Sequence, residues 1–158
     1  MASAKILTLC DSLVSAINTA WTGKGADDSV SRVYIAPVTV DELSSLTGRK
    51  VFVFPGPYES GLENRGEDQW SYTIGILIVE RYTAAGDPTA AWIDDRVDFV
   101  EGTVSDTIDY TGRSLLSISG RRLWTESIEI ETYSLETLNQ KKIFWSELTA
   151  VFKELVTA

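Results

Sequence analysis

The sequence predicts an α+β domain in which a mixed, mainly antiparallel sheet of about five strands is flanked by two helices. Apolar residues recur at helical spacing in two long stretches, and five other stretches are rich in β-branched and aromatic residues. Along the chain these stretches follow the order α-β-β-β-α-β-β. The 158 residues are predicted to form one domain, because 44% of them are apolar and no linker interrupts them.

The first helix is predicted over residues 4–21, with Ser3 as its N-cap. Its apolar residues are spaced three or four positions apart and form one stripe: Ile6, Leu9, Cys10, Leu13, Val14, Ile17 and Trp21. Cys10 lies inside this stripe, so it is predicted to be a small core residue rather than a reactive thiol.

Two short strands are predicted next. Residues 32–38 have strand composition, and Pro37 is expected at the end or edge of that strand because it has no N–H to donate. Residues 39–48 predict a helical turn that stops at Gly48. The second strand follows at residues 50–55.

The third strand, residues 70–82, is apolar on both faces in its middle. One face carries Tyr72, Ile74, Ile76 and Ile78, and the other carries Leu77 and Val79. This pattern is typical of a central strand that is covered on both sides.

Between the second and third strands, the composition of residues 55–69 predicts an extended loop, far longer than an ordinary hairpin connection. Paired carboxylates in the loop suggest acid–base chemistry, but a flexible loop holds such groups too imprecisely for catalysis. The residues alone leave two interpretations open, a catalytic loop or a surface that holds another protein, and they favour the surface. Its candidate interface residues are Tyr58, Glu59, Glu63, Arg65, Glu67 and Asp68.

The second long helix is predicted to start at Asp87-Pro88, with Asp as N-cap and Pro at the first helical position. Its apolar stripe consists of Ile93, Val97, Val100, Val104 and Ile108. Residues 111–120 fit no single element.

Two closing strands complete the prediction. Residues 121–133 alternate, with Trp124, Ile128 and Ile130 facing one way and Glu129, Glu131 and Tyr133 the other. Residues 143–156 have apolar spacing that fits a helix and a composition that fits a strand. The β-branched and aromatic content favours a strand that pairs with residues 122–133.

The composition excludes several classes of function and several kinds of site. A net charge of −9 argues against a protein that grips nucleic acid through phosphates. The absence of histidine excludes Ser–His and Cys–His nucleophile pairs and histidine metal sites. A single cysteine forms no internal disulfide, and no apolar run is long enough to span a membrane. The chain is expected to be soluble, made in the cytoplasm, and without a cofactor or metal.

Each charged cluster in the sequence can be interpreted either as a functional site or as a solvated surface. The acidic helix face of Asp94, Asp95, Asp98 and Glu101 has the spacing of a cation site, but a solvated helix back is favoured. Three basic doublets, each just before a strand, are either solvated strand ends or ion-pair sites between subunits: Arg49-Lys50, Arg121-Arg122 and Lys141-Lys142. Glu129 and Glu131 lie either on a solvent face or on an acidic face that lines a shared lumen.

The arrangement resembles the tail terminator and tail-completion proteins of long-tailed bacteriophages, which include the lambda minor tail protein U group and head–tail joining relatives. The resemblance is carried by an N-terminal amphipathic helix, a strand ending in Ala-Pro, the segments "VFVFP" and "WSYTIGILIVERY", a Pro-started helix and the terminal "IFWSELTAVFKEL". It covers residues 4–156 as a pattern.

The resemblance implies a non-enzymatic virion protein at the head–tail junction, made in the host cytoplasm. Six copies would form a ring that caps the tail tube, ends its polymerisation and meets the head connector. DNA would pass through the lumen without specific binding. Alternatives are a head-closure or tail-tube subunit, a small carboxylate-dependent hydrolase, and a host adaptor. The long helix at residues 4–21 speaks against a tube subunit.

Overall fold

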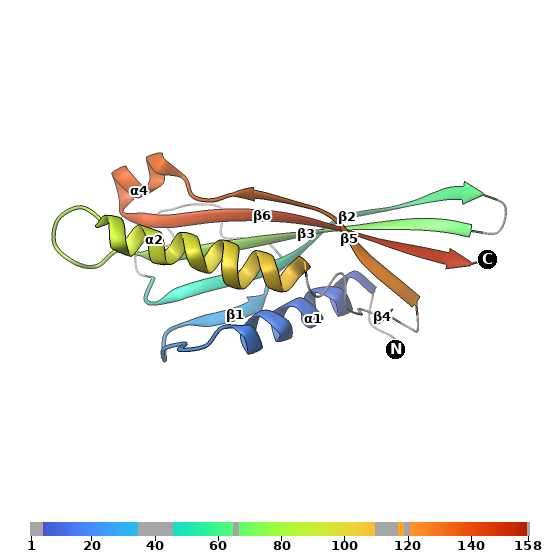
Figure 1. Ribbon diagram of the computed structural model, residues 1–158, viewed down its shortest axis with the longest axis horizontal. Helices are drawn as coiled ribbons and strands as arrows, with labels where there is room; N and C mark the ends of the chain where they lie inside the picture. The colour runs from blue at the N-terminus through green and yellow to red at the C-terminus, as the bar shows by residue number, and fades with distance from the viewer. Residues whose placement is uncertain (1–4, 35–45, 65–66, 110–116, 119–120, 158) are drawn as a thin grey trace.

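The structure, a computed structural model, describes residues 5–34, 46–64, 67–109, 117–118 and 121–157. Figure 1 shows a long, twisted sheet with helices packed on one of its faces. The described elements, in chain order, are α1 (Lys5–Ala20), β1 (Ser29–Arg32), β2 (Arg49–Asn64), β3 (Glu67–Arg81), α2 (Ala90–Asp98), the π-helix η2 (Phe99–Ser105), β4 (Ser117–Ile118), β5 (Arg121–Glu131), α4 (Leu135–Lys141) and β6 (Ile143–Thr157).

The strand order of the sheet is β1-β2-β3-β6-β5-β4. β1 and β2 are parallel, and every other neighbouring pair is antiparallel. The predicted α+β class with a mixed, mainly antiparallel sheet is confirmed. The predicted strand at 143–156 is confirmed as β6, which pairs with β5 on one side and β3 on the other.

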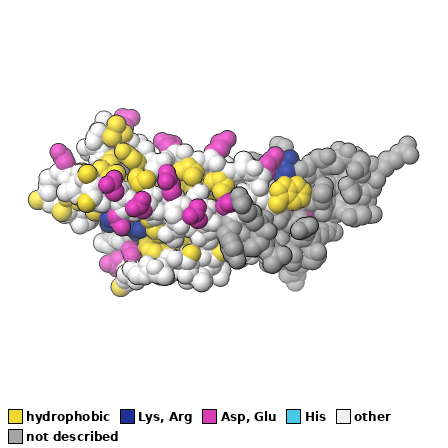
Figure 2. Space-filling model, viewed as in Figure 1, with side chains coloured by type: hydrophobic (Ala, Val, Ile, Leu, Met, Phe, Trp, Pro, Cys, Tyr) yellow, Lys and Arg dark blue, Asp and Glu magenta, His cyan; other side chains and the backbone are white. Residues whose placement is uncertain are grey.

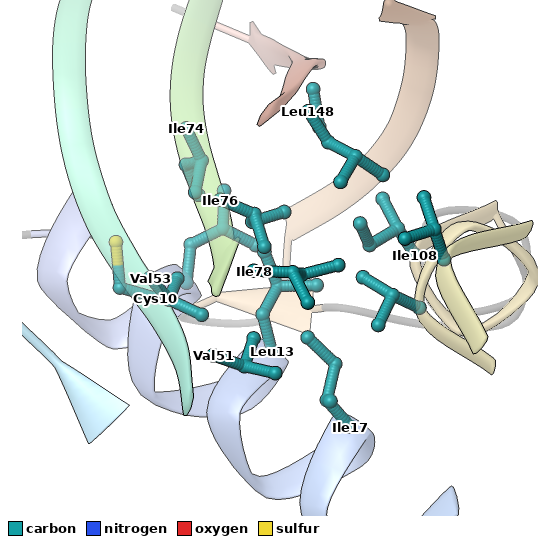
Figure 3. Close-up of a cluster of buried hydrophobic side chains, with 14 of the residues drawn as sticks. Cys10, Leu13, Ile17, Val51, Val53, Ile74, Ile76, Ile78, Ile108 and Leu148 are labelled. Carbon is teal, nitrogen blue, oxygen red and sulfur yellow. The ribbon is translucent and has the colours of Figure 1, made fainter. Parts of the chain in front are cut away.

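The main core lies between the sheet and the helical layer. Figure 3 shows Leu13 and Ile17 from α1 and Ile108 from the second helical segment pointing toward Ile76 and Ile78 of β3. Most of the predicted apolar stripe is buried as expected, Val14 is partly buried, and Cys10 is fully buried within the stripe. Burial raises the pKa of the Cys10 thiol to about 12. The thiol is therefore protonated at neutral pH and serves as a core group.

A smaller apolar cluster covers the opposite face of the sheet. Leu77 and Val79 of β3 are buried there, together with Ile143. Partly buried hydrophobic residues pack against them: Leu46, Phe52, Phe54 and Trp145. The prediction that β3 is central and covered on both faces is confirmed.

The predicted loop at 55–69 is wrong, because β2 and β3 continue through this interval as one long hairpin. Their pairing extends from Arg49↔Glu80 to Asn64↔Glu67. Residues 65–66, at the turn, lie outside the described residues.

The glycine and prolines that suggested a loop belong to an irregularity in a strand. The register of β2 shifts between Pro55 and Tyr58. A Cβ on Gly56 would lie 2.7 Å from the carbonyl oxygen of Thr73, so the two strands approach closely at this point. Pro is tolerated here because β1 pairs with β2 as far as Val53, and the following part of β2 has no further strand beside it on that side among the residues that the structure describes.

The helices also differ from the prediction. Thr89, not Asp87, caps α2, because its hydroxyl oxygen accepts the N–H of Trp92 at 3.2 Å. The helix then continues as the π-helix η2. Residues 135–141 form a third α-helix, α4, where a connection was predicted, and the Ser134 hydroxyl oxygen caps it by accepting the N–H of Thr137.

The first strand is shifted toward the N-terminus. The prediction was 32–38, whereas β1 covers Ser29–Arg32, and only the Val33 N–H continues the pairing, to the carbonyl of Val53. Residues 35–45, which include most of the predicted helical turn, lie outside the described residues.

One predicted face assignment on β5 is wrong. A bulge between Thr125 and Ser127 shifts the register against β6. Trp124 is therefore opposite Lys153, whereas Ile128 is opposite the core residue Ala150, so the two side chains face opposite ways. Tyr133 is also misassigned: it follows the strand and packs on the core, with its ring 5.8 Å from that of Phe144.

Replacing Ile76 with alanine is expected to lower the free energy of unfolding by about 2–5 kcal/mol, because it leaves a cavity in the main core. Ile130→Ala is the matched control, since Ile130 is 38% exposed, and its effect should stay below about 1 kcal/mol. Urea denaturation followed by tryptophan fluorescence measures both. Equal losses would contradict this description of the core.

Candidate functional site

The long hairpin forms a projecting arm together with the end of β6. We define the arm as residues 59–64 of β2, 67–71 of β3 and 155–157 of β6. In Figure 1 these three strands extend to the right past α1 and past the end of β5. The three strands stay paired to the tip of the arm, where Glu67 of β3 pairs with Asn64 of β2 on one side and with Thr157 of β6 on the other. No described helix lies over the arm in this view.

A buried polar contact marks the root of the arm. The Tyr72 hydroxyl donates to the Glu154 carboxylate at 2.8 Å, and both side chains are almost inaccessible to solvent. Tyr72 pairs in register with Tyr58 of β2. A buried carboxylate must be hydrogen-bonded to be tolerated, so this contact ties β3 to β6 where the arm leaves the core.

The structure brings the predicted loop residues together on this arm. Tyr58 lies at its root and Glu59 and Glu63 lie on β2, while Glu67 and Asp68 lie on β3. Arg65 lies outside the described residues. These positions share one hydrogen-bonded ladder of paired strands instead of a loop.

The three basic doublets do not form one patch. Arg49 is opposite Glu80 near the start of β6, so Arg49-Lys50 and Lys141-Lys142 lie at the same end of the sheet. Arg121-Arg122 begin β5 at the arm end, because Leu123 is opposite Glu154. The 11 positions between Ile143 and Glu154 on β6 separate the two ends by about 35 Å.

Two of the doublets are engaged within the subunit. The Nε of Arg49 donates to Glu80 at 2.9 Å, and the Lys50 ammonium donates to the carbonyl of Asp27. Lys142 has a left-handed backbone that ends α4, and its ammonium donates to the carbonyl of Gly86 at 2.6 Å.

Arg49 belongs to a charged cluster that the sequence analysis missed. Glu80 accepts from the Nε of Arg49 and, at 2.7 Å, from the Nε of Arg96 on α2. Asp95 contacts both guanidinium groups, at 3.3 and 3.1 Å. The signal was present in β3, because Glu80 continues the core-facing series of Ile74, Ile76 and Ile78. A charge in that series indicates a buried ion pair.

Aromatic rings enclose the same cluster. The guanidinium of Arg49 lies 4.4 Å from the centre of the Phe99 ring and 5.7 Å from that of Trp21. Arg96 lies 4.3 Å from the centre of the Trp92 ring. These cation–π contacts join α1, α2 and η2 to the end of the sheet.

Two cavities of about 370 and 480 Å³ border Arg49. Their charged walls include Asp28, Glu80 and Arg96, all of which already have hydrogen-bond or ion-pair partners inside the protein. The arrangement therefore favours a structural role for the cluster, which clamps the helical layer to the sheet.

Figure 2 shows acidic side chains scattered over the face on which Figure 1 draws α2, and the predicted acidic helix face does not gather into a cation site. Asp95 is occupied by two arginines. Among the described residues, no group of three or more histidine, cysteine or acidic side chains has an arrangement that can hold a metal ion. Across the same residues, no helix is long and apolar enough to cross a membrane.

Glu129 and Glu131 are both exposed on the sheet face opposite the helices. Glu147 of β6, which sequence reasoning did not single out, is directly opposite Glu131 and also exposed. Carboxylates in directly opposed positions repel each other, so this acidic face has an electrostatic cost to the stability of the chain.

A scan of the chain against models of known protein families gives no match, and a search among characterised proteins gives none either.

Glu80→Ala is expected to lower the free energy of unfolding by about 3–5 kcal/mol, because it leaves two largely buried guanidinium groups without their main counter-ion. Asp95→Ala is the matched control. It contacts the same arginines, but its side chain is 66% exposed, so its loss should cost less than about 1 kcal/mol. Chemical denaturation measures both variants, and comparable losses would argue against the clamp.

Asp28 makes stability depend on pH. Partial burial by itself raises the pKa of this carboxyl group, but the N–H groups of Arg49 and Gly25 and the charges of Arg49 and Lys50 outweigh burial and lower it below 3.8. A carboxyl group whose pKa is lower in the folded state stabilises the protein at pH values above its pKa in the unfolded state. This stabilisation is lost as the pH falls through the pKa of the folded state.

The stability advantage of the wild type over Asp28→Asn is therefore expected to be constant above about pH 5 and to shrink below about pH 4. Denaturant titrations across this range measure the difference, with Asp94→Asn on the exposed face of α2 as control. A difference that grows on acidification would contradict the assignment.

Proposed function

We propose that this chain is a structural subunit of a bacteriophage tail, which assembles as a ring that caps the tail tube, ends its polymerisation and joins the tail to the head connector. The observation that carries the proposal is the arm. Three paired strands project past the helical layer, and a projecting sheet of this kind gains cover by contacting another chain.

The proposed ring uses different surfaces of neighbouring subunits. The arm of one subunit would contact the body of the next, which is a heterologous interface. Such contacts form a closed ring when the rotation between neighbouring subunits is a whole fraction of a full turn. We propose six subunits per ring. The acidic residues predicted on the arm, Glu59, Glu63, Glu67 and Asp68, would meet a basic partner surface. Arg121 and Arg122 remain the candidate cations for this contact, because Arg49, Lys50 and Lys142 are engaged inside the subunit.

The acidic sheet face suits a ring whose lumen passes DNA. Glu129, Glu131 and Glu147 share the face opposite the helices, and carboxylates at a lumen wall repel phosphates instead of binding them. DNA would therefore move through without specific contacts. In this proposal the protein acts at the head–tail junction of the virion after synthesis in the host cytoplasm, and it is not an enzyme.

A head-closure subunit would use the same arm and remains the alternative role. α1 lies over one face of the sheet, and this helical cover disfavours a tail-tube subunit, which would be built almost entirely of strands. A carboxylate-dependent hydrolase is disfavoured, because three of the acidic residues at the two cavities, Asp28, Glu80 and Asp95, are held in internal ion pairs and hydrogen bonds.

Replacing residues 61–69 with Asn-Gly is expected to prevent assembly while the subunit remains folded. Ser60 and Trp70 pair directly, so a two-residue turn joins them without disturbing the core. Native mass spectrometry of the wild type, alone and with tail-tube protein, should show a hexamer in at least one condition, and the shortened variant should stay monomeric in both.

The control is a full-length variant with Gln69→Asn on the arm, which keeps the strand length and should assemble like the wild type. Circular dichroism and thermal unfolding establish that the shortened variant is folded. Ring formation by the folded, shortened variant would overturn the role of the arm, and a wild type that is monomeric in both conditions would count against the ring.

A further inference from the structure

A second open margin of the sheet lies away from the arm, along β5. Ser127–Glu131 pair with Val151–Glu147 of β6 on one side. β4, the neighbour on the other side, pairs only with Arg121 and Arg122. Among the described residues, Ser127–Glu131 therefore have no strand partner at their outer edge. Figure 1 shows this part of β5 as the upper margin of the left half of the sheet. Open edges present backbone N–H and C=O groups to any extended chain.

The two sides of this margin differ in chemistry. On the helical side, Ile128 packs against the core, but Ile130 is 38% exposed, and Leu135 of the adjacent α4 is 61% exposed. On the opposite side, Glu129 and Glu131 point away from the core. A strand added here would place alternate side chains beside Ile130 and beside the two carboxylates.

This charge pattern determines which kind of strand can pair with the outer edge of β5. A second copy of β5, paired edge to edge, would place carboxylates beside carboxylates, which is unfavourable. A strand with basic residues at alternate positions would instead neutralise Glu129 and Glu131, and its intervening apolar residues would cover Ile130. The required partner is a protein segment that alternates apolar and basic residues.

We propose that the outer edge of Ser127–Glu131 binds an extended, alternating apolar–basic segment of another protein by β-strand addition. Backbone hydrogen bonds supply the pairing, and the carboxylates and Ile130 select the side chains. The site lies on β5, away from the arm, and does not depend on the proposed ring. Where this segment is bound, it neutralises Glu129 and Glu131, which then no longer contribute to the proposed acidic lumen wall.

The first test compares synthetic peptides of nine residues with blocked ends. A peptide of alternating valine and lysine is expected to bind the full chain at least about tenfold more tightly than one of alternating valine and glutamate, from the sum of several cross-strand pairs. Fluorescence anisotropy with dye-labelled peptides measures both affinities. Equal affinities, or no binding of the lysine peptide at millimolar concentration, would overturn the proposal.

A second pair of peptides tests backbone pairing separately from charge. The N–H groups of alternate residues in a strand point to opposite edges. Methylating the backbone nitrogen of every valine, or of every lysine, therefore removes the donors of one edge at a time. Strand addition predicts that one methylated peptide loses binding and the other keeps it. If both bind like the parent, the interaction is only electrostatic and the proposal fails.

Protein variants locate the site. Glu129→Lys combined with Glu131→Lys is expected to weaken binding of the lysine peptide at least about tenfold and to make the glutamate peptide the tighter ligand. Asp94→Lys combined with Glu101→Lys gives the same net charge on exposed positions of α2 and η2, and should leave the preference unchanged. If both double variants act alike, or if the wild type dimerises through this edge without binding peptide, the assignment is wrong.

Discussion

The ladder between β3 and β6 is the interaction on which the rest of the structure depends. It pairs 15 consecutive positions without a register shift, from Glu67↔Thr157 to Arg81↔Ile143. The two strands lie far apart in the sequence, so the loop closure between them is entropically costly, and only the combined core on both faces offsets it. Because this register is continuous, it fixes which residues of both strands face the helices, and it extends the sheet beyond them as the arm.

The two faces of this ladder differ in packing and in charge. On one face the apolar side chains of β3 meet α1 and η2, and at its end the pairing of Glu80 with Arg49 and Arg96 holds α2 in place. The other face carries a small apolar cluster near Leu77 and the exposed acidic residues Glu129, Glu131 and Glu147 on β5 and β6. One face of the sheet is thus covered by helices, and the other is acidic and only partly covered. This difference suits the proposal that the chain assembles with other chains.

Periodicity was sufficient to predict the parts of the fold that local pattern controls. The stripe of α1, the two apolar faces of β3 and the strand character of β6 follow from the spacing and type of side chains, and the structure agrees with them. The hairpin was missed because Pro55, Gly56 and Pro57 have loop composition, and only the position of β1 shows that they lie at a sheet edge. The bulge at Thr125–Ser127 depends on pairing between distant segments, which spacing along one strand does not encode. The place of Glu80 in the core-facing series of β3 indicates a buried charge, but its partners Arg49 and Arg96 come from distant segments.

The two prolines in β2 have a consequence for how the sheet can grow. β1 stops at the register of Val53, and a strand continuing its line would next meet Pro55 and Pro57, two positions with no amide hydrogen. Within the described part of the chain, strand addition is therefore obstructed at Pro55 and Pro57 on the β2 side and open at Ser127–Glu131 on the β5 side. Sheets that accept strands at both margins propagate into fibres, whereas a sheet that accepts them at one margin is completed by a single added strand. The same two residues that make the hairpin look like a loop in the sequence thus hinder the addition of a further strand along this part of β2.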